Sequence, residues 1–356
     1  MENQENKTEI KKRSSRRKKF YLSEFLAEFV IKSVAFTSFA IIVLIFIFVF
    51  REAIPVFFQK PTSTSHEEFL QSETYGEEPS ETQAAPEQIE QPVPSLETSG
   101  AEGQATLSNL TSKEWQPISA NPRYGLLPLF IGSLNVTLVA VFLAAPLAIL
   151  AAIFSTFFAP RKLREVIKPT IELLAGFPSV VVGFFALVTI ATLCQNLFGF
   201  TYRLNAFIGG LALSLAVIPI IYTVTEDALS AVPKYFTEAS YALGANKWQT
   251  AFKVVVPAAT PGIFAAMLLG VGRAFGETMI VLMATGNAAQ FTFNLFKPVR
   301  TMSATIGAEM AEVVFGDVHY GVLFLIGAFL FIFTFTLNAI AEFYVRNKLM
   351  KRFSGE

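Results

Sequence analysis

Residues 238–287 read EASYALGANKWQTAFKVVVPAATPGIFAAMLLGVGRAFGETMIVLMATGN, and this stretch decides how the chain is built. Its first half is polar and rich in residues that favour helix. Its second half is an apolar run that carries two opposite charges, Arg273 and Glu277. The stretch therefore predicts a surface-exposed helical segment joined directly to a charged membrane helix.

The composition of the whole chain is that of an integral membrane protein. Of its 356 residues 53% are hydrophobic and only 16% are charged, against roughly 25% charged in soluble proteins. The charges are clustered, and the uncharged runs between them are long enough for membrane helices, because a bilayer core of about 30 Å needs about 20 helical residues. We therefore expect an all-α integral membrane protein with six transmembrane helices.

The chain divides into segments of different character. The expected membrane helices have the approximate ranges 30–50, 129–157, 172–198, 204–225, 260–285 and 318–343. The expected domains are a basic tail (1–29), the first helix (30–50), an acidic Pro/Ser/Glu-rich segment (51–122), the main transmembrane domain (126–345, with a polar loop at 226–257) and a second tail (346–356). A short loop is expected at 158–171, and an outer segment at 286–317.

The distribution of Lys and Arg predicts the orientation. Residues 1–25 hold eight of them, the loop 158–171 four, the loop 226–257 three and the C-terminal tail four. Six crossings put all four regions on one side, and the positive-inside rule makes that side cytoplasmic. Five or seven crossings would leave one basic end outside. Because the basic tail lies next to a membrane helix, this rule explains it more simply than nucleic-acid binding does. Contact with anionic lipid would also favour a basic tail there.

The acidic segment 51–122 falls on the opposite side of the membrane. It holds twelve Glu and few apolar residues. Such a composition cannot bury enough apolar area to offset chain entropy, so the segment is expected to be largely disordered. The role of residues 51–114 is left open.

The polar loop 226–257 predicts two short helices at an angle. Gly244 interrupts the helical pattern, and a residue without Cβ suits a corner with positive φ. An apolar docking face is expected from Tyr235, Phe236, Ala239, Ala242 and Leu243. The alternative, an amphipathic helix lying on the membrane surface, fits the composition equally well.

The spacing of this loop carries a family resemblance. Glu238-Ala239-Ser240, three residues, Gly244, nine residues and Val254-x-Val256-Pro257 resemble the "EAA" loop of ABC importer permeases, in which Ala stands at the Ser240 position. The resemblance implies a type I ABC importer permease core whose coupling helix, residues 234–250, docks into a separate cytoplasmic ATPase. Glu238, Ala239, Gly244 and Pro257 are the residues it assigns to ATPase coupling.

The charges of the fifth helix admit two interpretations. Arg273 and Glu277 are spaced i, i+4 and share a helix face. They form either a static ion pair that fixes helix packing or a part of the translocation path. In the second case the planar guanidinium offers paired donors to a tetrahedral oxyanion, and Glu277 holds Arg273 when the anion is absent.

The sequence RAFGETMIVLMATGN around this pair resembles the permeases of phosphate-specific ABC importers, the PstC type more than the PstA type. Trp115-x-Pro, Gly125-Leu-Leu-Pro-Leu, Glu172-Leu-Leu-Ala-Gly-Phe-Pro-Ser and Pro219 agree with it, so the resemblance covers about residues 115–345. It implies a phosphate importer in the bacterial plasma (inner) membrane. The implied partners are a PstA-type second permease, a PstB-type ATPase dimer and a PstS-type phosphate-binding protein.

The sequence contains no motif for ATP binding or for catalysis by this chain. It contains no G-x-x-x-x-G-K-[ST] pattern for ATP, so we expect a transport subunit that is not itself an enzyme. No cofactor and no metal site are expected, and Glu309 and Glu312 are interpreted as solvated outer residues. The alternative functions are a permease for another oxyanion such as molybdate or sulfate, an ATP-independent anion channel, and a membrane scaffold.

Overall fold

The computed structural model describes residues 22–57, 107–119 and 121–353. Within them six helices are long and apolar enough to cross a membrane, which confirms the predicted number. These spans are Phe29–Val56, Leu127–Phe158, Ser179–Phe198, Ala206–Ser230, Lys247–Phe275 and Val318–Phe343. Met1–Val49 and Phe50–Glu356 form separate compact units, and the packing described below belongs to the second.

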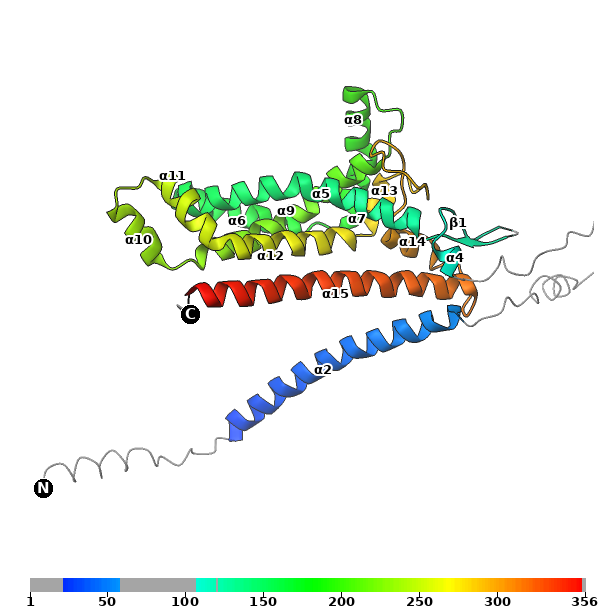
Figure 1. Cartoon of the computed structure of the whole chain (residues 1–356), viewed down its shortest axis with the longest axis horizontal. Helices are drawn as coiled ribbons and strands as arrows, with labels where there is room; N and C mark the ends of the chain where they lie inside the picture. Colours follow the sequence, from blue (N-terminus) through cyan, green and yellow to red (C-terminus); the bar gives the residue numbers. More distant parts are fainter. Residues whose placement is uncertain (1–21, 58–106, 120, 354–356) are drawn as a thin grey trace, which may run out of the picture. The chain divides into compact units, whose positions relative to one another are not determined.

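The elements follow one another along the chain as Figure 1 shows. The first part contains α2 (Leu22–Ala53), a 3-10 turn (Ile54–Phe57), α4 (Leu107–Leu110), β1 (Trp115–Gln116), β2 (Arg123–Tyr124), α5 (Leu127–Ile153), α6 (Arg161–Ala175), α7 (Ser179–Phe185) and α8 (Ala191–Phe198). The second contains α9 (Ala206–Ser230), α10 (Lys234–Ala242), α11 (Lys247–Thr250), α12 (Val256–Phe275), α13 (Met279–Ala284), α14 (Met302–Glu309) and α15 (Val318–Phe353). Three π-helical segments, Phe154–Phe158, Ala186–Ile190 and Ala251–Val255, continue or join these helices.

The core is a packed group of long helices. α5 lies against α9, α9 against α12, and α12 against both α5 and α15 (Figure 1). Small residues let the backbones approach, as is usual between membrane helices. On α5 they are Ala140, Ala144, Ala148 and Ala152, all fully buried. On α12 a Cβ at Gly270 would stand 2.7 Å from Ile221 of α9.

The prediction of a loop at 158–171 is wrong, and so is the prediction that the third membrane helix starts at residue 172. Residues 161–175 form α6, an amphipathic helix whose Ile167 and Ile171 pack against the core. A spacing of four residues puts both side chains on one helix face. The chain breaks at Gly176–Pro178, because the residue before a proline is disfavoured in a helix, and the membrane span starts at Ser179.

The fifth membrane helix is also interrupted. The prediction was one continuous helix over 260–285, but α12 ends at Phe275 and α13 starts at Met279. Gly276 ends the helix, in keeping with the low helix propensity of glycine. α13 packs against α7, and Gly183 permits this contact, since a Cβ there would stand 3.1 Å from the Met279 carbonyl oxygen.

Both ends of the acidic segment are ordered, which corrects the boundaries predicted for 51–122 and the end of the first helix predicted at residue 50. Residues 51–57 belong to α2 and the 3-10 turn that follows it. Residues 107–119 contain α4 and β1, and β1 pairs with β2 in an antiparallel hairpin, the one sheet within the described residues. Trp115 and Tyr124 of this hairpin are buried. Residues 1–21 of the basic tail and 58–106 of the acidic segment lie outside the described residues. At the other end α15 continues through most of the expected tail, to Phe353.

Candidate functional site

The predicted corner at Gly244 is present between α10 and α11. Gly244 has φ +82°, a left-handed conformation that costs an L-residue about 1–2 kcal/mol. Asn246 then caps α11, accepting from the Gln249 backbone N–H at 2.9 Å, while the Gln249 side chain accepts from the Asn246 N–H at 2.9 Å. This reciprocal capping box fixes the start of the second arm.

A buried hydrogen bond ties the two arms of the corner together. The hydroxyl oxygens of Ser240 and Thr250 lie 2.9 Å apart, and both side chains are buried. Ser240 is the residue that departs from the EAA pattern, in which Ala stands at this position. Its hydroxyl supplies a contact between the arms that Ala lacks.

The corner exposes apolar side chains at the end of the bundle away from β1 and α14 (Figure 1). Leu243 is 89% exposed, and Tyr235 and Trp248 are also exposed. Of the expected docking face, Phe236 alone is partly buried. Such a patch beside a membrane helix is typical of an interaction surface.

The other residues predicted for ATPase coupling flank this patch. Glu238 and Ala239 are exposed on α10, and Pro257 lies in the first turn of α12. Pro257 follows the π-helical segment Ala251–Val255, within the continuous span Lys247–Phe275. The geometry therefore groups Glu238, Ala239 and Gly244 on the corner itself and puts Pro257 within the membrane span that follows it.

Arg273 and Glu277 form the expected pair across the helix break. Arg273 Nη2 lies 3.3 Å from Glu277 Oε2. The Arg273 side chain is 53% exposed, whereas that of Glu277 is 5% exposed. The backbone around Glu277 is held from α14, because the Ser303 hydroxyl donates to the Glu277 carbonyl oxygen at 2.6 Å.

Arg273 lines a small cavity of about 60 Å³. Two helix breaks border it: Phe177 lies in the turn between α6 and α7, Ser179 is the first residue of α7, and Ile280 lies in α13 just after the second break. Irregular backbone at membrane depth is tolerated only where it is buried in protein or lines a water-filled cavity. The two breaks and the guanidinium thus meet at one small cavity, whose lining is apolar except for Ser179 and Arg273.

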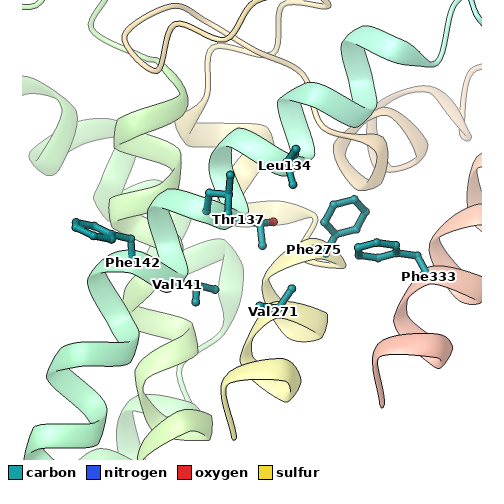
Figure 2. Close-up of a pocket in the computed structure, with 8 residues that line it drawn as sticks. Leu134, Thr137, Val141, Phe142, Val271, Phe275 and Phe333 are labelled. Atoms are coloured by element: carbon teal, nitrogen blue, oxygen red, sulfur yellow. The ribbon is translucent and has the colours of Figure 1, made fainter. Parts of the chain in front are cut away.

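A larger cavity of about 260 Å³ lies on another face of α12 (Figure 2). Figure 2 shows Val141 and Phe142 of α5, Phe275 of α12 and Phe333 of α15 around it. Its lining contains no charged residue, so this cavity offers nothing to neutralise an anion. Of the two cavities, the smaller one alone has a charged residue, Arg273, in its lining.

A second charge cluster, which the sequence did not reveal, lies near the corner at Gly244. Glu226 is 2% exposed in the last turns of α9. It accepts from Arg164 Nη2 at 2.8 Å and lies 3.1 Å from Lys168 Nζ. The hydrogen bond to Glu226 and its charge raise the pKa of Lys168. In the sequence, the basic residues of α6 predicted only membrane orientation, because Glu226, the residue they bind, is about sixty positions away.

Glu309 is a third carboxylate, largely shielded from solvent, and the prediction that it is simply solvated is wrong. It is 12% exposed, accepts from Trp115 Nε1 at 3.2 Å, lies 2.9 Å from His319 Nε2 and pairs with Arg300. Burial raises its pKa, but the hydrogen bonds from His319 and Trp115 and the charge of Arg300 outweigh burial and lower it. Glu312, in contrast, is exposed as expected.

The cluster around Glu309 joins the β1–β2 hairpin, α14 and α15. Its members are Trp115, Arg300, Glu309 and His319. Their spacing in the sequence is not that of neighbours on one helix or strand, so the sequence did not predict the cluster. Across the part of the chain that the structure describes, no group of three His, Cys, Asp or Glu side chains converges as metal ligands.

Known proteins resemble the chain over most of the membrane domain. The family model described as "Binding-protein-dependent transport system inner membrane component" matches residues 144–348. The probable ABC transporter permease protein YqgH of Bacillus subtilis (strain 168) is 37% identical over 243 residues, 68% of this chain and 79% of that protein.

Two further relatives carry a more specific name. The phosphate transport system permease protein PstC of Mesorhizobium japonicum is 34% identical over 255 residues, 66% of this chain and 77% of that protein. PstC 1 of Mycobacterium tuberculosis is 30% identical over 287 residues, 70% and 85% respectively. Among solved structures, the inward-facing MetNI methionine ABC transporter is 19% identical, with a TM-score of 0.49 over 62% of this chain and 95% of that one.

Proposed function

The chain belongs to the family of binding-protein-dependent transport system inner membrane components, and from this premise we propose that it is the transmembrane permease subunit of an ATP-driven phosphate importer. It is a multi-pass membrane protein with six spans within its described residues. The substrate in this proposal comes from the relatives named phosphate transport system permease and from the chemistry of the Arg273 cavity.

The observation that carries the proposal is the half-exposed guanidinium of Arg273 at a break in a membrane helix. A charged side chain facing lipid costs about 2.5–3.5 kcal/mol on insertion scales. The exposed half of Arg273 is therefore assigned to a water-filled path shared with a second permease subunit. A buried Glu277 at 3.3 Å keeps the cation in position without covering it.

A phosphate ion suits this arrangement. Its tetrahedral oxygens accept the paired, planar donors of a guanidinium. Glu277 competes for the same donors, so it weakens the bound state and favours release. We assign Arg273 the role of substrate contact and Glu277 the role of limiting its affinity.

An importer permease works with a second permease and with ATPase subunits, and we propose that these are of the PstA and PstB types, with a PstS-type binding protein outside. The exposed corner around Gly244 docks into the ATPase, with Glu238 and Ala239 at the contact and Pro257 at the joint with α12. The corner then lies in the cytoplasm together with both chain termini. ATP drives the transport cycle because it binds the two conformations with different affinity.

Three alternatives remain as outcomes of one experiment. A permease for molybdate or sulfate would accumulate that ion in preference to phosphate. An anion channel would pass phosphate without ATP, and a membrane scaffold would pass none.

The experiment reconstitutes the complete complex in vesicles and measures uptake of labelled phosphate, sulfate and molybdate with and without ATP. We expect ATP-dependent uptake of phosphate. Arg273→Gln is compared with Arg161→Gln, which alters a 93% exposed arginine on α6. Loss of uptake in the first variant and not in the second supports the role of Arg273. Equal uptake in both would reduce the Arg273–Glu277 pair to a structural contact.

A further inference from the structure

The Glu226 carboxylate connects two helices that lead to different parts of the transport machinery. It sits near the end of α9, is 2% exposed, and is bound by two cations of α6, Arg164 and Lys168. Arg164 uses two nitrogens, with Nη2 at 2.8 Å and Nε at 3.3 Å from Glu226 Oε1. Lys168 binds the other oxygen at 3.1 Å. Both carboxylate oxygens therefore have a cationic partner.

This geometry fixes α6 against α9 in one rotational setting. Arg164 and Lys168 are four residues apart, so they lie on the same helix face, where like charges repel unless an anion stands between them. A rotation of α6 about its axis would separate at least one cation from Glu226. The carboxylate would then be left buried with incomplete compensation, which is strongly unfavourable.

The two helices joined by Glu226 end at the two functional regions. From the end of α9 at Ser230 the chain needs only residues 231–233 to reach α10 of the coupling corner. At the far end of α6, Leu174 and Ala175 line the Arg273 cavity together with Ser179. The Glu226 cluster thus provides a second connection between the coupling corner and that cavity, through α9 and α6, beside the continuous helix Lys247–Phe275 that carries Arg273.

We propose that Glu226 is a positioning residue that makes α6 and the end of α9 move as one body when the coupling corner moves. Displacement of α10 is passed through α9 and Glu226 to α6, and α6 carries the turn at residues 176–178 that borders the Arg273 cavity. This role rests on the proposed function, because it describes how ATP-driven motion reaches the substrate path. Glu226 itself contacts no substrate.

The first test separates coupling from assembly. In the reconstituted complex, phosphate uptake and ATP hydrolysis are measured together for Glu226→Gln and for Glu165→Gln. Glu165 is a matched control, since it forms an exposed ion pair with Arg161 on the same helix α6. We expect Glu226→Gln to lower the phosphate transported per ATP by about tenfold, the effect of one lost charge-assisted hydrogen bond on an equilibrium. Glu165→Gln should match the wild type.

Two further variants keep the test informative if Glu226→Gln assembles poorly. Lys168→Gln removes the half-exposed cation and should lower the same ratio by a smaller factor. Glu226→Asp retains the charge and should recover part of the coupling that Glu226→Gln loses. A wild-type ratio in both Lys168→Gln and Glu226→Gln overturns the proposal.

The second test does not depend on the substrate. Spin labels at positions 162 and 234, introduced after replacement of the one cysteine, Cys194, report the distance between α6 and α10 in the full complex with and without ATP. We expect one narrow distance in both states for the wild type and a broad distribution for Glu226→Gln. If Glu226→Gln leaves the distance distributions unchanged, the proposal that Glu226 holds α6 and α9 together is overturned. If the wild type keeps the narrow distance but takes up no phosphate, only the proposed substrate is overturned.

Discussion

Replacing Gly244 by Val is a direct test of the corner. The residue has φ +82°, and an added Cβ would meet no atom within 4 Å. The substitution therefore introduces backbone strain and no steric collision. A left-handed conformation costs an L-residue about 1–2 kcal/mol, and a β-branched side chain is the least tolerant of it. If the strain opens the corner, affinity for the ATPase should fall about 5- to 30-fold.

The assay is the binding of the purified ATPase to the permease complex in nanodiscs, followed by phosphate uptake. Gly244→Asn should have a smaller effect, because Asn enters the left-handed region more readily. The matched control is Gly316→Val, since Gly316 has φ +85° and an added Cβ there also meets no atom within 4 Å. Wild-type ATPase affinity in Gly244→Val would refute the reasoning, and so would an equal loss in Gly316→Val.

Arg273→Gln should leave the complex assembled but lower phosphate uptake by about tenfold or more, as measured by chromatography and vesicle uptake. Ser240→Ala should lower the free energy of unfolding by about 1–3 kcal/mol, because it leaves the buried Thr250 hydroxyl without its partner; Ser240→Ala/Thr250→Val should recover part of that loss. The depressed pKa of Glu309 predicts stability that is present above the ordinary value of 4.5 and lost as pH falls through the lower folded-state value. Hydrogen exchange at Trp115 should increase in that acid range, and Glu309→Gln should remove the pH dependence.

The sequence was sufficient for features that depend on local pattern. Long uncharged runs predicted six spans, and a glycine between two helix-forming stretches predicted the corner at Gly244. Arg273 and Glu277 were recognised as a pair because their spacing is local. In each case the physical cause acts within a few residues, so that no knowledge of the folded chain was needed.

The features that the sequence concealed depend on distant partners or on weak local signals. The apolar run continues through Gly276, and hydrophobicity alone gives no sign that the helix stops there. The basic residues of α6 predict only topology, since their partner Glu226 lies in another helix. Glu309 was treated as solvated because Trp115 is 194 positions away.

The exposed guanidinium of Arg273 has a consequence for biosynthesis. A copy that is already inserted in the membrane but has not met the second permease presents this charge to acyl chains. Covering it upon assembly removes a cost of about 2.5–3.5 kcal/mol, equivalent to roughly 70- to 400-fold in the assembly equilibrium. In the proposed importer, an orphan copy is therefore less stable than an assembled one by this amount.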